Sequence, residues 1–269
     1  MGATQEIRAA AVAGLFYPRE ADRLSRDIRV MLKGASKEEA LSGVLKALIV
    51  PHAGYVYSGP VAASAYAQLV PLRDTIRRVV LLGPTHRVYV SGLALPGVQA
   101  FETPLGRIQV DQDAVHFLTP LRQVSTSPAA HEPEHSLEVQ LPFLQTMLSD
   151  FQLLPLAVGD ASPQAVAEVI EVLWGGPETL IVVSSDLSHY LPYDVAQKVD
   201  RGTCAGILEL RQVNSHEQAC GATPVNGLMI AARHHRLTPH LLDLRNSGDT
   251  AGDRDRVVGY AAIAFTEEP

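Results

Sequence analysis

The amino-acid sequence predicts an α/β fold: a central, mixed but mostly parallel sheet flanked by helices. Two observations lead to this prediction. Short apolar runs rich in β-branched residues recur along the chain, as in strands that are buried on both faces. Helical stretches separate these runs, and no repeat or linker-like stretch interrupts the alternation. We therefore expect one domain over residues 1–269.

The first half of the chain should begin with a helix and then build strands. Ser58 and Pro60 are typical of a helix start, as cap and first-turn residue. Alternating residues around 104–106 predict a peripheral hairpin. The expected elements are a helix from about Glu20 to Lys33, a polar loop around Gly34 to Ser42, a strand Val44–Pro51, a helix from Ser58 to about Leu69, a strand Arg78–Leu82 and a hairpin Gly97–Val110.

The second half alternates more regularly. Leucines at helical spacing predict a helix from Glu134 to Leu148, with His135 and Glu138 near its start. The other expected elements are a strand Phe151–Val158, a helix Pro163–Leu173, a strand Thr179–Ser184, a helix Tyr193–Leu210, a helix Pro224–His235 and final strands Thr238–Asn246 and Val257–Phe265.

Composition and charge exclude several classes of protein. A hydrophobic share of 46% with 19% charged residues argues against disorder. A net charge of −7 without a basic stripe argues against nucleic acid as a partner. The apolar runs are shorter than the roughly 18 residues that span a bilayer. Residues Met1 to Glu6 lack secretory and myristoylation signals, so we expect a cytoplasmic protein that binds no membrane.

Polar side chains follow the strand-like runs. His52 comes after the first run, His86 after the second, and Asp186 and His189 after the third. Ligands in open α/β sheets bind at the carboxyl ends of the strands. A single histidine there is more often a structural residue, but three in equivalent places predict a polar pocket.

The two cysteines are expected to be free thiols in a cytoplasmic chain. Cys204 lies in a helical stretch and is interpreted as a small buried hydrophobe. Cys220 lies in a glycine-containing loop that enters a helix, where helix N-termini stabilise thiolates, so it is the reactive candidate. Two imidazoles and a thiolate, from His52, His86 and Cys220, can bind iron, copper or zinc. Because their spacing matches no compact metal motif, the fold must assemble such a site.

Other residues are candidates for supporting roles. Asp186 is expected to orient His189 and raise its basicity, so that this pair would be catalytic. The hydroxyl groups of Tyr55 and Tyr57 could bind substrate. His135 and Glu138 are assigned to the surroundings of the site at most, because charged residues in the first turn of a helix also arise from capping alone.

Six motifs carry a resemblance to a known family. In chain order they are Ala13-Gly-Leu-Phe-Tyr-Pro18, Pro51-His-Ala-Gly-Tyr-Val-Tyr-Ser-Gly59, Gly83-Pro-Thr-His86, Glu134-His-Ser-Leu-Glu138, Ser184-Ser-Asp-Leu-Ser-His189 and Ala219-Cys-Gly-Ala-Thr-Pro224. From about residue 8 to residue 265 the chain resembles the Memo family, whose prokaryotic members are also called AmmeMemoRadiSam system protein B.

The resemblance implies a fold and a metal site. The fold would be that of the class III extradiol (LigB-like) dioxygenases, non-haem iron enzymes that open catechol-type rings. The metal, iron or copper, would be held by the equivalents of His52, His86 and Cys220, with His189 in the place of the dioxygenases' acid/base histidine. Those enzymes use a carboxylate where this chain has Cys220. Because a thiolate is softer and oxidisable, ring cleavage is disfavoured.

Three functions are compatible with these residues. The first is a metal-dependent oxidoreductase acting on oxygen or a small molecule. The second is a non-catalytic module that binds a peptide or protein: the resemblance implies phosphotyrosine-peptide binding for a eukaryotic member, and AMMECR1-like and radical-SAM partners for prokaryotic ones. The chain shows only Arg87 near the pocket in sequence. The third is a cysteine hydrolase with Cys220, His189 and Asp186, which leaves the other two histidines without a role.

Overall fold

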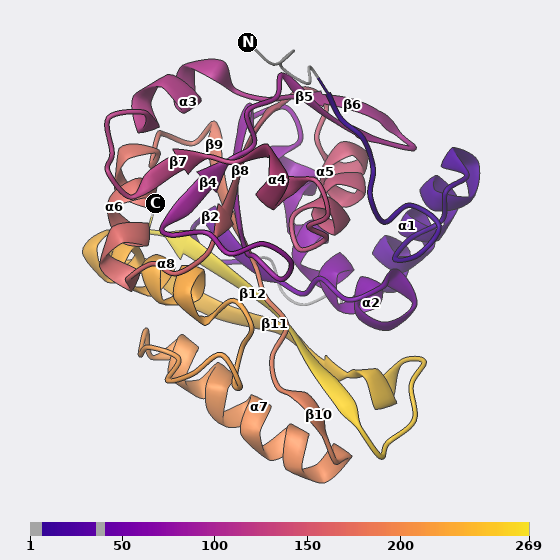
Figure 1. Cartoon of the computed structure of the whole chain (residues 1–269). Helices are drawn as coiled ribbons and strands as arrows, with labels where there is room; N and C mark the ends of the chain where they lie inside the picture. The colour runs from indigo at the N-terminus through magenta and orange to yellow at the C-terminus, as the bar shows by residue number, and fades with distance from the viewer. Residues whose placement is uncertain (1–6, 36–40, 269) are drawn as a thin grey trace.

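A nine-stranded mixed sheet forms the centre of the computed structural model, which describes residues 7–35 and 41–268 (Figure 1). Four parallel strands make its middle: β2 (Val44–Val50), β9 (Thr179–Ser184), β3 (Arg78–Pro84) and β8 (Gln152–Val158). Leu48 and Val50 pack into one apolar core, and Ala47 and Ile49 into the other. Because alternate residues are buried on opposite faces, these strands have continuous apolar sequences.

The flanks of the sheet are largely antiparallel. β12 (Val257–Glu267) pairs antiparallel with β2, with β11 (Thr238–Asn246) and with β10 (His189–Leu191). On the other side β4 (Leu93–Leu95) is antiparallel to β8 and parallel to β7 (Val124–Thr126). The α/β fold with a mixed, helix-flanked sheet is confirmed. "Mostly parallel" applies only to the centre, because the short connection between β11 and β12 permits only an antiparallel pair.

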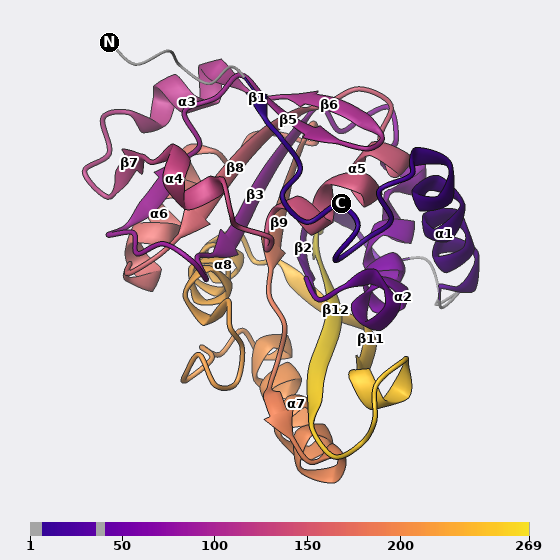
Figure 2. The same ribbon diagram turned by 45° about the vertical axis from the view of Figure 1, so that its right-hand side comes forward.

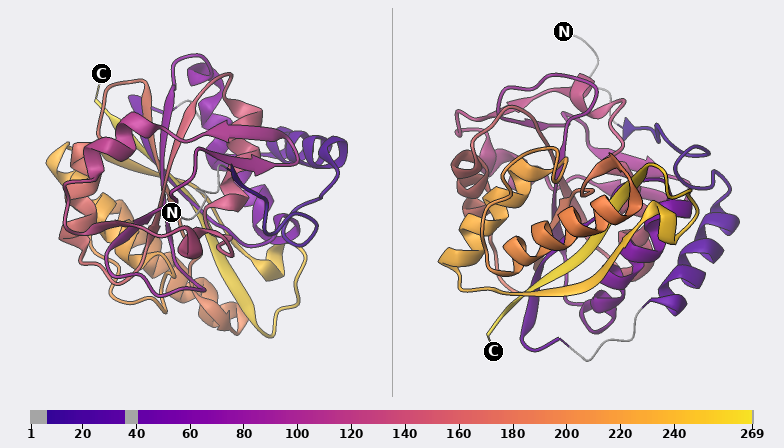
Figure 3. Two further views of the ribbon diagram at one scale, coloured as in Figure 1. Left: turned by 45° about the horizontal axis from the view of Figure 1, so that its top comes forward. Right: turned by 90° about the horizontal axis from the view of Figure 1, so that it is seen from below.

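Helices cover both faces of the sheet (Figures 1 and 2). The face with Leu48 carries α1 (Ala21–Gly34), α2 (Tyr55–Tyr66), the 3₁₀ helix η1 (Ala67–Leu72) and α5 (Leu141–Met147). The opposite face carries α3 (Gln112–Leu118), α6 (Pro163–Val172), α7 (Tyr193–Leu208) and α8 (Ala222–His234). Seen from below, α7 lies over β11 and β12 (Figure 3). The short elements α4 (Pro128–His131), η2 (Glu138–Gln140) and η3 (Ser247–Asp249) lie in connections.

The expected hairpin is present in a second, small sheet. β5 (Ala100–Thr103) and β6 (Gly106–Gln109) pair antiparallel, and β1 (Ile7–Arg8) pairs parallel with β5. Phe101 and Ile108 reach the same core as Leu48. The hairpin therefore closes one face of the central sheet and ties the N-terminal segment to it.

Two helix predictions were wrong in their bounds. α2 begins at Tyr55, so Pro60 lies inside it, and the Ser58 hydroxyl donates to the Ala53 carbonyl instead of capping. The predicted helix from Glu134 to Leu148 is a turn, then η2, then α5. Proline has no N–H and clashes with the carbonyl four residues before it, so it is tolerated only in the first turn of a helix. Pro142 therefore lies in the first turn of α5, which begins at Leu141.

The other expected helices and strands are confirmed with small shifts of their ends. Elements α3, α4, β1, β4, β7 and β10 were not predicted, because they are short. Residues 36–40 of the expected polar loop and the segment Met1 to Glu6 lie outside the described residues. Over the described ranges, no helix combines the length and apolar character needed to cross a membrane.

Candidate metal centre

The carboxyl ends of β2, β9 and β3 lie side by side and bring three loops together. His52 follows β2, Asp186 follows β9 and His86 follows β3. The His52 backbone N–H donates to Asp186 Oδ1 at 2.7 Å. The imidazole rings of His52 and His86 lie with their centroids 5.2 Å apart. Neighbouring parallel strands thus convert a regular spacing in sequence into one pocket.

Cys220 joins this pocket from the loop before α8. Its backbone N–H donates to the Asp186 carbonyl at 3.2 Å, and its Sγ lies 3.3 Å from His52 Nε2. Gly221 permits the close approach, because a Cβ there would lie 2.7 Å from Ser185 Cβ. One donor atom from each of His52, His86 and Cys220 lies within 4.8 Å of the others.

A buried hydrogen-bond network determines which nitrogen of His52 carries the proton. The Ser184 hydroxyl donates to the Ser136 carbonyl at 2.6 Å, so its oxygen must accept the other bonds. Gln140 Nε2 donates to that oxygen at 2.8 Å, and His52 Nδ1 lies 2.9 Å from it. Nδ1 is therefore protonated, and the lone pair of Nε2 faces Cys220.

Glu134 orients the second imidazole in the same way. His86 Nδ1 lies 2.9 Å from Glu134 Oε1, and the His86 backbone N–H donates to Oε2 at 2.6 Å. Burial alone would raise the pKa of Glu134, but hydrogen bonds from His135, His86 and Ser136 hold it far below its usual value. Since this ionised carboxylate accepts a hydrogen bond from Nδ1–H, His86 Nε2 is left as the candidate ligand atom.

The protonation states suit a metal ion. Burial, together with the neighbouring imidazoles of His86 and His135, holds the pKa of His52 well below its usual value, so the ring is neutral. Burial and the Asp186 carboxylate raise the pKa of the Cys220 thiol to about 12. The thiolate predicted from the helix N-terminus is therefore not stabilised by the protein alone. The neutral imidazole of His52 and a thiol that a cation would deprotonate fit a borderline or soft metal.

His135 completes a group of three imidazoles. Its ring centroid lies 5.4 Å from that of His52 and 4.7 Å from that of His86. Its Nδ1 lies 3.2 Å from Glu134 Oε1. Phe16 packs on its other side, with centroids 4.7 Å apart. His135 thus lies beside His52 and His86, the two candidate histidine ligands.

The structure does not pair Asp186 with His189 as predicted. Burial raises the pKa of Asp186, whose carboxylate accepts from the His52 backbone. Between these two described side chains no hydrogen bond forms. His189 is half-buried on β10, close enough to affect the pKa of both His52 and Asp186. Because the nearest imidazole to Cys220 is His52, the geometry does not support a Cys220–His189–Asp186 triad.

The remaining sequence candidates have other surroundings. The Tyr55 hydroxyl donates to the Val139 carbonyl at 2.7 Å within the core. Tyr57 is 40% exposed. The Glu138 carboxylate accepts from Arg8, from Tyr17 and from the backbone N–H groups of residues 11 and 12. Glu138 therefore anchors the N-terminal segment instead of lying beside the imidazoles.

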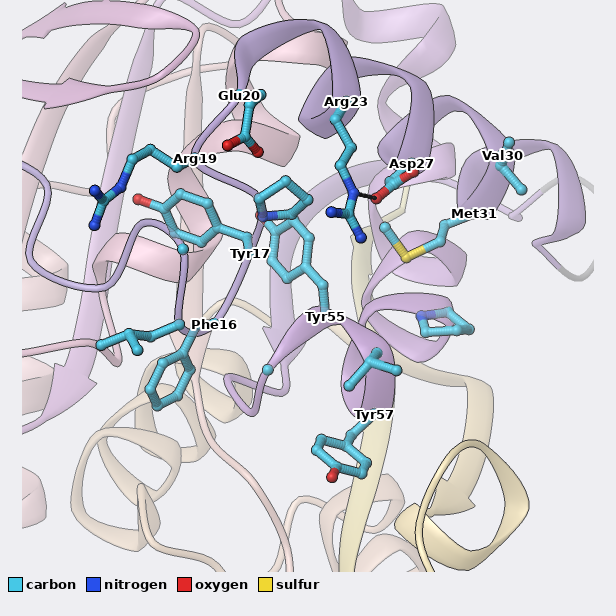
Figure 4. Close-up of a pocket in the computed structure, with 16 residues that line it drawn as sticks. Phe16, Tyr17, Arg19, Glu20, Arg23, Asp27, Val30, Met31, Tyr55 and Tyr57 are labelled. Carbon is cyan, nitrogen blue, oxygen red and sulfur yellow. Dashed lines mark ion pairs between the residues drawn. The ribbon is translucent and has the colours of Figure 1, made fainter.

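A groove of about 820 Å³ lies beside the pocket, between the N-terminal segment, α1 and the start of α2 (Figure 4). It shares Phe16 with the surroundings of His135. Arg19 and Arg23 line it, and Arg23 pairs with Asp27 at 3.7 Å. Arg19 and Arg23 therefore line a groove that shares Phe16 with the pocket, an arrangement that the sequence did not reveal.

Comparison with known proteins shows what this arrangement is related to. A sequence model described as Memo-like protein matches residues 8–264. The chain belongs to the Memo family. A MEMO1 family protein of Methanosarcina barkeri is 37% identical, with 96% of this chain and 99% of the relative aligned. MEMO1 family proteins of Ignicoccus hospitalis and Metallosphaera sedula are 35% and 33% identical, with 96% and 97% of this chain and 98% and 99% of theirs aligned.

The residues that orient the two histidine ligands in this Memo-family protein were missed by sequence reasoning. Glu134, Ser184 and Gln140 fix the imidazoles through hydrogen bonds. The motif that contains Glu134 was recognised from the sequence, but His135 and Glu138 were selected from it as candidates and Glu134 was not. A signal existed for Ser184, which ends a buried strand immediately before the pocket. Gln140 carried no signal, because its partners lie 44 and 89 residues away.

Proposed function

We propose that this Memo-family protein is a metal-dependent oxidoreductase that binds iron or copper through His52, His86 and Cys220. Zinc also fits these ligands but would not supply redox chemistry. One observation carries the proposal. One nitrogen of each imidazole converges with the Cys220 thiol, while protein acceptors hold the two Nδ1 atoms. Outer hydrogen bonds of this kind accompany histidine ligands in metalloproteins.

When bound, iron or copper would supply one-electron oxidation and reduction. Three protein ligands leave further positions for oxygen or a small organic substrate. The side chain of His86 is 30% exposed, so the pocket is open to such molecules. His189 is assigned the transfer of protons, because it is half-buried at the pocket edge and influences the pKa of His52.

The buried network of Ser184 and Gln140 holds the ring of His52, itself 2% exposed, in one orientation. The fold relation to LigB-like dioxygenases that the family resemblance implies would be consistent with oxygen chemistry. Ring cleavage is not proposed, since a thiol takes the place of the carboxylate ligand.

The test is elemental analysis of protein purified without chelators or metal-affinity columns. Wild type should contain near-stoichiometric iron or copper, and His52→Ala and Cys220→Ser should lose it. Cys204→Ser is the matched control, because Cys204 is a buried free thiol in α7 that is absent from the pocket. Wild type that stays metal-free after iron(II) and copper(I) are supplied would refute the proposal.

The groove supports a second candidate, a module that binds a peptide or a partner such as an AMMECR1-like or radical-SAM protein. Leu15 and Val56 on its rim are 80% and 64% exposed, and Arg19 adds positive charge. Large exposed apolar side chains beside polar ones are typical of interaction sites. Leu15→Asp should weaken capture of the purified partner without changing metal content. Equal capture of the partner by wild type and by Leu15→Asp would exclude this groove as the binding site.

A further inference from the structure

A second group of metal-ligand side chains lies outside the pocket, where α6 packs against the end of α8. Glu171 is on α6, His234 is the last residue of α8 and His235 follows it. We propose that these three residues form a separate binding site for a borderline divalent transition ion such as Zn²⁺ or Cu²⁺. This proposal is independent of the function assigned to the first pocket.

One ring nitrogen of each histidine lies close to the Glu171 carboxylate. His234 Nδ1 lies 2.9 Å from Glu171 Oε1, and His235 Nε2 lies 2.9 Å from Oε2. One donor atom from each residue lies within 4.8 Å of the others. Imidazole and carboxylate ligands bind zinc at about 2.0–2.2 Å, so small side-chain rotations would enclose an ion. Neutral imidazoles need only move a proton to their other nitrogen to offer these lone pairs.

His235 is held in place before any ion binds. Its ring stacks on Trp174, with centroids 3.7 Å apart and planes 7° from parallel. Trp174 is fixed in turn, because its Nε1 donates to Glu267 at 3.2 Å and the Lys46 ammonium lies 5.1 Å from the ring centroid. A ligand that is already ordered loses little entropy on binding.

The electrostatics favour a cation. The carbonyl end of α8 carries partial negative charge. The Glu171 carboxylate lies between the two imidazoles and accepts from both, one on each oxygen, which places its negative charge where the ion would bind. The positive charge of Arg233, the residue before His234, is engaged elsewhere, because its guanidinium donates to the Leu210 carbonyl. Cys220 lies before the opposite end of this 13-residue helix, about 20 Å away at 1.5 Å per residue.

Trp174 makes the site directly measurable, because it is the single tryptophan of the chain. A paramagnetic Cu²⁺ ion bound to His235 should quench the fluorescence of Trp174, and the quenching should saturate as copper is added. Zn²⁺ does not quench and binds such ligands more weakly than Cu²⁺, so a large excess of Zn²⁺ should displace the copper and restore the emission. Both titrations use the full chain.

Glu171→Gln and His234→Ala leave the stacked pair intact and should weaken the apparent Cu²⁺ affinity at least about tenfold, since loss of a ligand costs no less than loss of an outer partner. His116→Ala, on the exposed face of α3, is the matched control and should titrate as wild type. Circular dichroism confirms folding of each variant. Absence of quenching in wild type, or equal curves for Glu171→Gln and wild type, would overturn the proposal. Loss of quenching in His52→Ala would assign the ion to the first pocket and also overturn it.

Discussion

Replacing Glu134 with glutamine should weaken metal binding without removing a ligand. Both oxygens of this carboxylate accept backbone N–H groups: Oε1 those of His135 and Ser136 at 3.0 and 2.9 Å, and Oε2 that of His86 at 2.6 Å. Glutamine has one acceptor oxygen, so in either orientation its NH₂ group faces at least one donor. The negative charge that holds the His86 Nδ1 proton is lost as well.

Two magnitudes follow. Loss of an outer partner of a histidine ligand costs about 10–100-fold in metal affinity. A buried donor left without an acceptor costs about 1–3 kcal/mol of the free energy of unfolding. Competition with a chelator measures the affinity, and urea unfolding of the metal-free protein measures the stability.

Glu138→Gln is the matched control. Glu138 is buried in the same motif and accepts from Arg8 and Tyr17, but it makes no contact with His86. Its substitution should lower stability and leave metal affinity near that of wild type. Wild-type affinity in Glu134→Gln, or an equal loss in Glu138→Gln, would refute the view that Glu134 acts by orienting His86.

Three further predictions concern stability. Burial lowers the pKa of His131 to about 4, so the unfolded chain binds the extra proton and stability falls as the pH drops from 6.5 towards 4. Between pH 7 and 5, wild type should lose about 2 kcal/mol more than His131→Gln in urea titrations, and parallel curves would contradict this. Gly221→Ala should cost about 1–3 kcal/mol by overpacking against Ser185 and should reduce metal content; unchanged values would show that the loop adjusts. Tyr17→Phe should cost about 1.5–3 kcal/mol in thermal unfolding, because it removes a hydrogen bond to the charged Glu138 carboxylate; no loss would mean that water replaces it.

Strand predictions succeeded because buried parallel strands have a local signature. β2, β3, β8 and β9 are continuous apolar runs, and each was located within a few residues. Helix bounds were less accurate where one residue overrides the apolar spacing. The leucine stripe from residue 137 to residue 148 is buried as expected, yet Pro142 divides the stretch.

The alternation of strands and helices, the position of His52 and His86 after strands, and the place of Cys220 in a constrained loop could all be predicted from local sequence. These are properties of neighbouring residues. Which side chains meet depends on the tertiary structure. Cys220 and His52 are 168 residues apart, and they touch because β2 and β9 are adjacent and Cys220 hydrogen-bonds to the loop after β9. The sheet order depends on the packing of the whole chain, which no local pattern records.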